Sequence, residues 1–382
     1  MLESAVQHIS PATVGPVVHV ISDAGPHPYF RTLVQAGGLD PRSLIVGCVG
    51  PAGTLQEDMG ELGVESFALG AVGRHELPVA VARLARILRR HAAPIVQSHL
   101  VDGSLVGLTA ARFARTPLAV FTAHHSHELP YHGRRLIWPD RLCAGPLSDR
   151  IIAPSLQVAE TLSRYTHVSP AKIAVVHHGF DMRALDPSAT RGESVRAELE
   201  LEGCTVLGVI GRLYALKNHA NLIRAFAALG PRPDLRLVIA GHGDREPLQQ
   251  IARTAGVGSR VLLVGARADV PTFLAACDAF VHPAVAESFG MVIVEAMAMG
   301  KPVLSTPVGI APEVITTGES GLLTTGSTVG ELVSGLKLLL SMRPRWGAVG
   351  AAARARVADF TAARMAEQYR KLYAAWLREA AP

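Results

Sequence analysis

The sequence alternates short β-branched runs with longer helical segments, and this alternation restricts the chain to a small group of folds. Parallel strands need long crossover connections, usually helices, so strand and helix patterns then follow one another along the chain. The first half has five runs with the length and composition of buried strands: Val17–Ile21, Leu44–Val49, Ile95–His99, Leu118–Ala123 and Arg150–Ser155. Between them lie helical patterns such as LPVAVARLARILRRH, residues 77–91. We therefore predict an α/β fold with a doubly wound parallel sheet.

The alternation stops once and then starts again. Residues 180–194, FDMRALDPSATRGES, are polar and contain Pro and Gly, which is typical of a linker between domains. Five further strand patterns follow it: Val206–Ile210, Leu235–Gly241, Val261–Gly265, Ala279–Pro283 and Pro302–Thr306. We predict two successive α/β domains, 1–184 and 185–358, and a terminal segment, 359–382.

The terminal segment has the pattern of an amphipathic helix that must dock on a domain. One helical face carries six large residues: Met365, Tyr369, Leu372, Tyr373, Trp376 and Leu377. These side chains could complete the second domain or return to the first domain, and the periodicity alone allows both.

Composition limits the class of protein. The chain has 382 residues, 18% of them charged, and a net charge of +5, with no basic run interleaved with aromatic residues. These values indicate a globular protein and argue against a nucleic-acid partner. Cys48, Cys143, Cys204 and Cys277 are far apart, so no CxxC motif exists and we expect reduced thiols. The N-terminal residues do not have the pattern of a signal peptide, and no apolar run approaches about 18 residues. We expect a cytoplasmic protein.

The segment after the first strand of the second domain offers two cations. In a doubly wound sheet, ligands bind at the carboxyl ends of strands. GRLYALKNH, residues 211–219, begins there; Gly211 permits a tight turn, and Arg212 and Lys217 follow it before the next helix. Two fixed cations at this point suit a diphosphate, particularly one that gains charge as it leaves. The alternative is that both are solvated surface residues.

AVAESFGMVIVEAMAMG follows another strand end and contains two glutamates. The pattern predicts a helix over 290–299, whose first amides and dipole would favour a phosphate. Glu287 then lies in the loop and Glu295 within the helix, so they do not form the acid/base pair of a glycosidase. We interpret them as acceptors for different hydroxyl groups of one ligand. An ion pair of Glu295 with Lys301 or Arg212 is the alternative.

These motifs together resemble glycosyltransferase family 4, of the GT-B fold. The resemblance rests on Glu-Ser-Phe-Gly-Met-x-x-x-Glu-Ala-Met-Ala-x-Gly-x-Pro-Val from residue 287, on GRL-x-x-x-K from residue 211 and on PVGIAPEVITTGESGLL from residue 307. LVIAGHGD (237–244) and HHGFD (177–181) also match. The Gly-x-Gly of GHGDRE could instead suggest a dinucleotide fold, but the third glycine is replaced by Glu246.

The resemblance implies two Rossmann-like domains across a cleft, with the last helix returning to the first domain. It also implies retaining transfer from a nucleotide sugar, a UDP- or GDP-sugar, without a metal or another cofactor. By position, Arg212 and Lys217 would bind the diphosphate, Glu287 the sugar hydroxyls, and Glu295 the ribose. The remaining donor contacts would come from Gly211, the amides of Phe289, Gly290, Met291 and Val292, and the region from Val264 to Arg267 near the base.

The first domain matches this family only in pieces. His99 and His124 end two strands and resemble family positions that face the cleft, with His99 on the acceptor side and His124 near the transferred sugar. The resemblance thus implies four catalytic residues: His124, Arg212, Lys217 and Glu287. His125, His127 and His132 follow, but their spacing does not support a zinc site, and polar cleft or solvated histidines are the alternative. Where many relatives have Gly-Gly after the first strand, SDAGPHPYFRTL has Gly25 alone, so its acceptor-binding role departs from the pattern.

We therefore predict a glycosyltransferase acting on a saccharide, lipid or small-molecule acceptor. The alternatives are a GT-B sugar-nucleotide epimerase and a catalytically silent sugar-nucleotide-binding subunit. Contact with a membrane surface is a further hypothesis, because the helix over 77–91 has an apolar face and four arginines: Arg83, Arg86, Arg89 and Arg90. Packing of that apolar face on the sheet is the interpretation we favour, so peripheral membrane association is the minor alternative.

Overall fold

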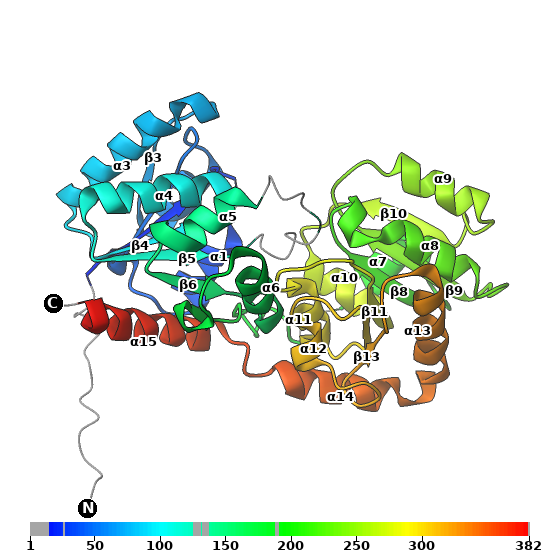
Figure 1. Ribbon diagram of the computed structural model, residues 1–382. Helices are drawn as coiled ribbons and strands as arrows, with labels where there is room; N and C mark the ends of the chain where they lie inside the picture. The colour runs from blue at the N-terminus through cyan, green and yellow to red at the C-terminus, as the bar shows by residue number, and fades with distance from the viewer. Residues whose placement is uncertain (1–14, 26, 125–130, 132–136, 188–190, 381–382) are drawn as a thin grey trace, which may run out of the picture. The chain divides into compact units, whose positions relative to one another are not determined.

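The computed structural model describes residues 15–25, 27–124, 131, 137–187 and 191–380, and the chain divides into two compact units (Figure 1). Unit 1 comprises Met1–Phe180 and Thr361–Pro382, and unit 2 comprises Asp181–Phe360. The segment tested for a signal peptide (1–14) and His125, His127 and His132 lie outside the described residues. Within the described ranges, no helix is long and apolar enough to cross a membrane.

Unit 1 contains a parallel sheet of seven strands in the order β3-β2-β1-β4-β5-β6-β7. Its strands are β1 (Val17–Ile21), β2 (Leu44–Cys48), β3 (Glu65–Ala68), β4 (Ile95–His99), β5 (Leu118–Thr122), β6 (Arg150–Ala153) and β7 (Ile173–Val175). Its helices are α1 (Pro28–Arg31), α2 (Thr54–Glu61), α3 (Leu77–Arg90), α4 (Val101–Ala114), α5 (Trp138–Leu142), α6 (Leu156–Thr166) and α15 (Ala362–Ala380).

Both faces of the central strands in unit 1 are buried, which explains their continuous apolar composition. Successive side chains alternate between the faces. Val18, Val20 and Phe121 pack in one core with helices α3, α4 and α6. Val17 and Val120 pack in another core with α15. The sheet is therefore a layer between two sets of helices, and α15 covers part of one face.

The terminal helix belongs to unit 1, as the resemblance implied. Met365, Tyr369, Tyr373 and Trp376 of α15 are buried in the core with the sheet, and Figure 1 shows this helix in red beside the unit 1 strands. The chain leaves and re-enters unit 1 at adjacent points, because Ala362 N donates to Phe180 O at 3.0 Å. A Cβ atom at Gly179 would lie 2.5 Å from Thr361 O, so this crossing has no space for a side chain.

Unit 2 repeats the architecture with a parallel sheet of six strands in the order β10-β9-β8-β11-β12-β13. Its strands are β8 (Thr205–Ile210), β9 (Leu235–Ala240), β10 (Val261–Gly265), β11 (Ala279–His282), β12 (Val303–Ser305) and β13 (Leu322–Leu323). Its helices are α7 (Glu193–Glu198), α8 (His219–Ala227), α9 (Glu246–Thr254), α10 (Val270–Ala276), α11 (Met291–Ala298), α12 (Ala311–Val314), α13 (Val329–Ser341) and α14 (Trp346–Val357). Leu207 and Val209 face a core with α8 and α13, whereas Val206 faces a core with α7 and α10.

The α/β prediction is confirmed, and every strand expected from the sequence is present to within one or two residues. Three further strands, β3, β7 and β13, were not predicted from the sequence, and each lies at the edge of its sheet. Edge strands are short and pair on one side only. Their sequences, ESFA, IAV and LL, are accordingly too short to give a strand signal.

Candidate functional site

In unit 2, the strand order reverses between β8 and β11, which are hydrogen-bonded neighbours. At such a reversal, the connections leave the sheet toward opposite faces and expose a crevice at the carboxyl ends of the strands. The two segments that the sequence analysis singled out, after residue 210 and after residue 282, are the loops that follow these two strands. The topology therefore places these two loops, which carry most of the predicted donor-site residues, side by side at the carboxyl ends of the strands.

The loop after β8 is held close to the neighbouring loops by backbone contacts. A Cβ atom at Gly241 would lie 1.9 Å from Gly211 O, so the segment after β9 can approach Gly211 only without a side chain. Val285 N donates to Leu216 O at 2.8 Å, which joins this loop to the loop after β11. Asn218, with φ of 60°, donates from Nδ2 to Pro283 O at 3.0 Å. These bonds fix the backbone on both sides of Lys217.

Lys217 and Glu287 form an ion pair between the two loops, with Lys217 Nζ donating to Glu287 Oε2. Their side chains are only 14% and 12% exposed. His282 Nε2, at the end of β11, lies 3.5 Å from the same carboxylate oxygen. Burial by itself would raise the pKa of Glu287, but His282 and the Lys217 ammonium outweigh it and hold that pKa well below its usual range. The carboxylate is therefore ionised and can accept hydrogen bonds.

Helix α11 begins beside this pair. Gly290 is its N-cap with φ of 86°, a conformation that favours glycine, and the predicted amides of Met291 and Val292 lie in the first turn. First-turn N–H groups have no acceptor within their own helix. Phe289 is buried, and its carbonyl accepts from Ile310 N at 2.7 Å. The loop that contains Gly309 thus borders the start of α11.

Glu295 lies one turn into α11, and desolvation by burial raises its pKa to about 7. The alternative partners that the sequence suggested are engaged elsewhere. Lys301 Nζ donates to the carbonyl oxygens of Ala275 and Cys277, at 3.1 and 2.8 Å. Arg212 is exposed, with its guanidinium 4.9 Å from the centre of the Tyr214 ring. Among the described residues, no ion pair links Glu295 to either cation, so its carboxyl group remains available to a ligand.

Val264 lies at the end of β10, the edge strand of the sheet, and Arg267 follows two residues after this strand. The Arg267 guanidinium donates to both oxygens of Glu198, at 2.8 and 3.0 Å, and to Asp269 at 2.8 Å. These carboxylates raise the pKa of Arg267 above its ordinary value. The guanidinium is therefore part of an internal ion-pair network, and contact with a base there would come from the backbone.

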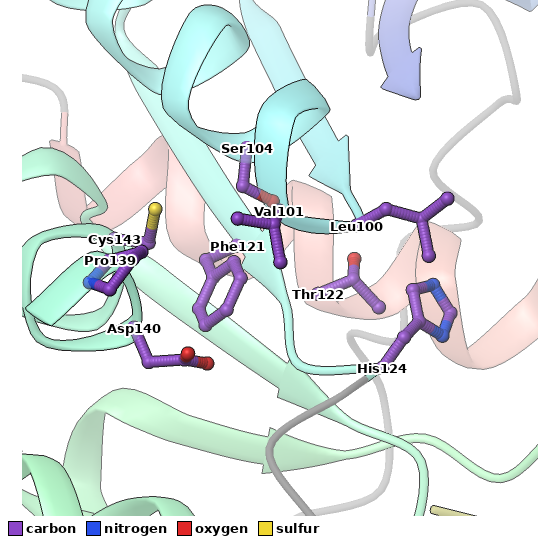
Figure 2. Close-up of a pocket in the computed structure, with 9 residues that line it drawn as sticks. All are labelled: Leu100, Val101, Ser104, Phe121, Thr122, His124, Pro139, Asp140 and Cys143. Carbon is purple, nitrogen blue, oxygen red and sulfur yellow. The ribbon is translucent and has the colours of Figure 1, made fainter. Parts of the chain in front are cut away.

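Unit 1 has its own reversal of strand order, between β1 and β4. The loop after β1 contains Gly25, whose amide donates to Asp23 Oδ1 at 3.0 Å. The predicted His99 ends β4 and is only 3% exposed. His124 follows β5 and lines a small pocket with Leu100, Thr122 and Ser104, as Figure 2 shows. No described residue hydrogen-bonds the buried Ser104 hydroxyl, which adds a polar atom to the lining of this pocket.

Three predicted residues, Lys217, Glu287 and the start of α11 at Gly290, are thus brought together in unit 2, while His99 and His124 lie together in unit 1. His282, a neighbour of Glu287, was not predicted from the sequence as a site residue. A polar residue at the carboxyl end of an apolar strand is the signal that could have identified it. Across the ranges that the structure describes, no group of three or more His, Cys, Asp or Glu side chains is placed to hold a metal ion.

The chain is similar to known proteins along almost its whole length. Residues 18–184 match the family model described as Glycosyltransferase Family 4, and residues 191–356 match the model described as Glycosyl transferases group 1. A D-inositol 3-phosphate glycosyltransferase of Mycobacterium leprae is 30% identical over 316 residues, which cover 75% of this chain and 72% of the relative. A protein of the same name from Thermobifida fusca is 33% identical over 232 residues, 57% of this chain and 52% of the relative.

Solved structures show the same fold. HepE of Anabaena in complex with UDP-glucose superposes with a TM-score of 0.83 at 22% identity, covering 94% of this chain and 99% of that one. A sucrose-phosphate synthase from Thermosynechococcus elongatus gives a TM-score of 0.76 at 20% identity, covering 94% and 100%. These likenesses confirm the predicted GT-B fold.

Proposed function

The chain belongs to the group 1 glycosyltransferases of family 4, and from this premise we propose that it transfers a sugar from a nucleoside diphosphate sugar to an acceptor hydroxyl with retention. In this proposal, residues 185–358 bind the donor and residues 1–184 bind the acceptor, with 359–382 returning to the first domain. UDP-sugars are the first donors to test, because the similar Anabaena structure contains UDP-glucose, and GDP-sugars are the second.

Each charged group of the unit 2 site has a distinct role in the proposal. Lys217 and Arg212 bind the diphosphate and stabilise the charge that develops when its bond to the sugar C1 breaks. The first-turn amides of α11 hold a phosphate or the sugar. Glu287 accepts from sugar hydroxyls, and Glu295 accepts from the ribose. The acceptor oxygen bonds to C1 on the face that the diphosphate leaves, and the acceptor proton passes to the departing phosphate.

The observation that carries this proposal is the Lys217–Glu287 ion pair between the loops after β8 and β11. A cation for the diphosphate and an acceptor for the sugar are in direct contact, which matches the two adjacent parts of a nucleotide sugar. Both side chains are mostly buried and are held by loops joined through backbone hydrogen bonds. A site organised before the ligand arrives loses less entropy on binding.

The proposal is tested by incubating the protein with UDP-, GDP- and ADP-sugars, each with and without an acceptor panel, in the presence of EDTA. The panel begins with inositol 3-phosphate, after the name of the Mycobacterium leprae relative, and adds saccharide and lipid acceptors. We expect nucleotide release that depends on both substrates and withstands EDTA. An epimerised donor would indicate an epimerase, and donor binding without turnover would indicate a silent binding subunit; either result contradicts the proposal.

A further inference from the structure

Three histidines of unit 1 form a continuous hydrogen-bonded row. His19 Nδ1 lies 3.0 Å from His99 Nε2, and His99 Nδ1 lies 2.9 Å from His124 Nε2. The rings of adjacent members are nearly parallel, at 19° and 25°. Both ring nitrogens of His99 are therefore engaged, one toward each neighbour.

The sheet itself produces this row. β1, β4 and β5 are consecutive neighbours, and the parallel register places His19 opposite Gln97 and His99 opposite Thr122. Because side chains alternate between faces, these four polar residues share the face that α15 covers. Tyr373 of α15 donates to Gln97, whose Nε2 donates to Thr122 Oγ1 at 2.9 Å. His19, Gln97, His99 and Thr122 thus form a polar band on the sheet, and α15 covers this band.

Burial keeps two members of the row, His19 and His99, neutral. His19 and His99 are 2% and 3% exposed. Desolvation lowers the pKa of His19 to about 3 and lowers that of His99 well below its ordinary value. A neutral imidazole carries one N–H, so His99 can donate to only one of its two neighbours.

The position of that proton decides the tautomer of the next ring. When His99 carries its proton on Nδ1, it donates to His124 Nε2, and a neutral His124 must be protonated on Nδ1. When His99 carries its proton on Nε2, it donates to His19, and His124 donates from Nε2. The hydrogen bond that one ring nitrogen makes fixes the protonation state of the other.

We propose that His99 is a positioning residue, which holds His124 in a single tautomer and ring orientation at the pocket shown in Figure 2. This inference rests on the proposed glycosyl transfer, in which His124 acts near the transferred sugar. It changes the predicted role of His99, because a buried ring with both nitrogens engaged acts on the acceptor through His124 and not by contact.

The two contacts of His99 can be removed separately. The side-chain amide of asparagine occupies the place of histidine Nδ1, and the amide of glutamine reaches the place of Nε2. His99→Asn therefore retains a partner for His124 and removes the partner of His19. His99→Gln does the reverse. Both substituted side chains are polar and of similar size. If His99 merely filled space in the core, the two substitutions would therefore have similar effects.

The first measurement is the ¹⁵N chemical shifts of the imidazole nitrogens in histidine-labelled full-length protein, with His124 assigned from a His124→Gln variant. We expect a single tautomer of His124 in the wild type and in His99→Asn, and averaged shifts of two tautomers in His99→Gln. The second measurement is turnover of the donor that the panel identifies. We expect kcat to fall about tenfold to a hundredfold in His99→Gln with an unchanged donor KM, and to be largely retained in His99→Asn.

Equal behaviour of the two variants in both measurements would overturn the proposal. If His99→Gln does not fold, the wild-type spectrum still decides, because averaged His124 shifts there contradict a fixed tautomer. The shifts require no substrate. A single His124 tautomer that is lost in His99→Gln, together with no turnover of any donor, would uphold the hydrogen-bonded row and disprove the glycosyltransferase proposal instead.

Discussion

The two units place different chemistry at the same point of the same architecture. Where the strand order of unit 2 reverses, the loops carry the charged residues Arg212, Lys217 and Glu287, and the carboxylate is held ionised. Where the strand order of unit 1 reverses, the nearby polar band beneath α15 combines Gln97 and Thr122 with the buried, neutral imidazoles of His19 and His99. A parallel sheet thus determines where a site forms, whereas the side chains at the strand ends determine what it binds.

The difference is physically consistent with the proposed division of substrates. A diphosphate requires fixed cations and backbone donors. Its oxygens can replace the Glu287 carboxylate as the partner of Lys217. An acceptor hydroxyl carries no charge to neutralise and requires directional hydrogen bonds. We therefore expect substitutions in unit 2 to change donor binding and turnover together, and substitutions in unit 1 to change turnover alone.

The largest effect is expected from the unit 2 cations. Lys217→Ala and Arg212→Ala each remove a charge-assisted contact to the leaving diphosphate, which is worth about 2–4 kcal/mol by analogy with an oxyanion donor. We expect kcat to fall by about two orders of magnitude or more in each variant. Lys337→Ala, an exposed lysine of α13, is the matched control. If both site variants keep the fold, as judged by circular dichroism, and turn over at a rate near that of the wild type, these residues do not stabilise the leaving diphosphate.

The next effect separates the two glutamates. Glu295→Ala should weaken UDP binding about tenfold to a hundredfold, as expected for loss of hydrogen bonds to a charged group. Glu287→Ala should leave UDP affinity close to that of the wild type and weaken binding of the UDP-sugar. Calorimetric titration of both variants with both ligands measures this. Equal losses for both ligands in both variants would show that the carboxylates do not contact separate ends of the donor.

The pH dependence of nucleotide binding tests the same carboxyl group. The pKa of Glu295 is raised to about 7 in the free protein, and ribose hydroxyls donate to its ionised form. UDP affinity should therefore rise with pH and be about tenfold higher at pH 8 than at pH 6. The phosphate of UDP also titrates near this range. The quantity to compare is therefore the difference in the pH dependence of UDP affinity between the wild type and Glu295→Gln. No difference between the two proteins would contradict the ribose assignment.

The stability of the free protein provides a ligand-free check on Glu295. Its folded-state pKa of about 7 exceeds the ordinary value of 4.5, so ionisation opposes folding. This cost is absent below pH 4.5 and complete above about pH 7, where it reaches about 3 kcal/mol. Glu295→Gln should therefore raise the unfolding midpoint at pH 8 and leave it nearly unchanged at pH 4. The reverse pattern would show that the carboxyl group is not desolvated.

The smallest expected effect concerns membranes. Ala80, Leu84 and Leu88 of α3 are buried in the unit 1 core, and Arg89 donates to Phe113 O at 2.7 Å. The apolar face of this helix is thus engaged with its own sheet and α4, as we favoured from the sequence. We expect no sedimentation with anionic vesicles at low salt. Binding that falls with added salt and in Arg86→Gln would instead indicate a lipid surface.

The positions of the charged residues of unit 2, in loop or helix, could be predicted largely from the sequence because their determinants are local. Glu287 and Glu295 are assigned to loop and helix by Gly290 and the apolar run after it, and GRLYALK gives its cations directly after a strand. What the sequence could not give is the contact of Lys217 with Glu287, because the two residues are 70 positions apart. His282 is only five positions from Glu287, and its place at the end of β11 was a local signal that remained unused.

The sequence by itself determined that the chain is a two-domain α/β protein, because strand burial and helix amphipathicity appear as short-range periodicity. It also determined which residues carry charge at the strand ends. Only the tertiary structure decided that His19, His99 and His124 are consecutive partners, since they lie on or just after three strands separated by crossover helices. It also decided how far the pKa of each carboxyl group shifts, because desolvation and neighbouring charge depend on which segments pack around it.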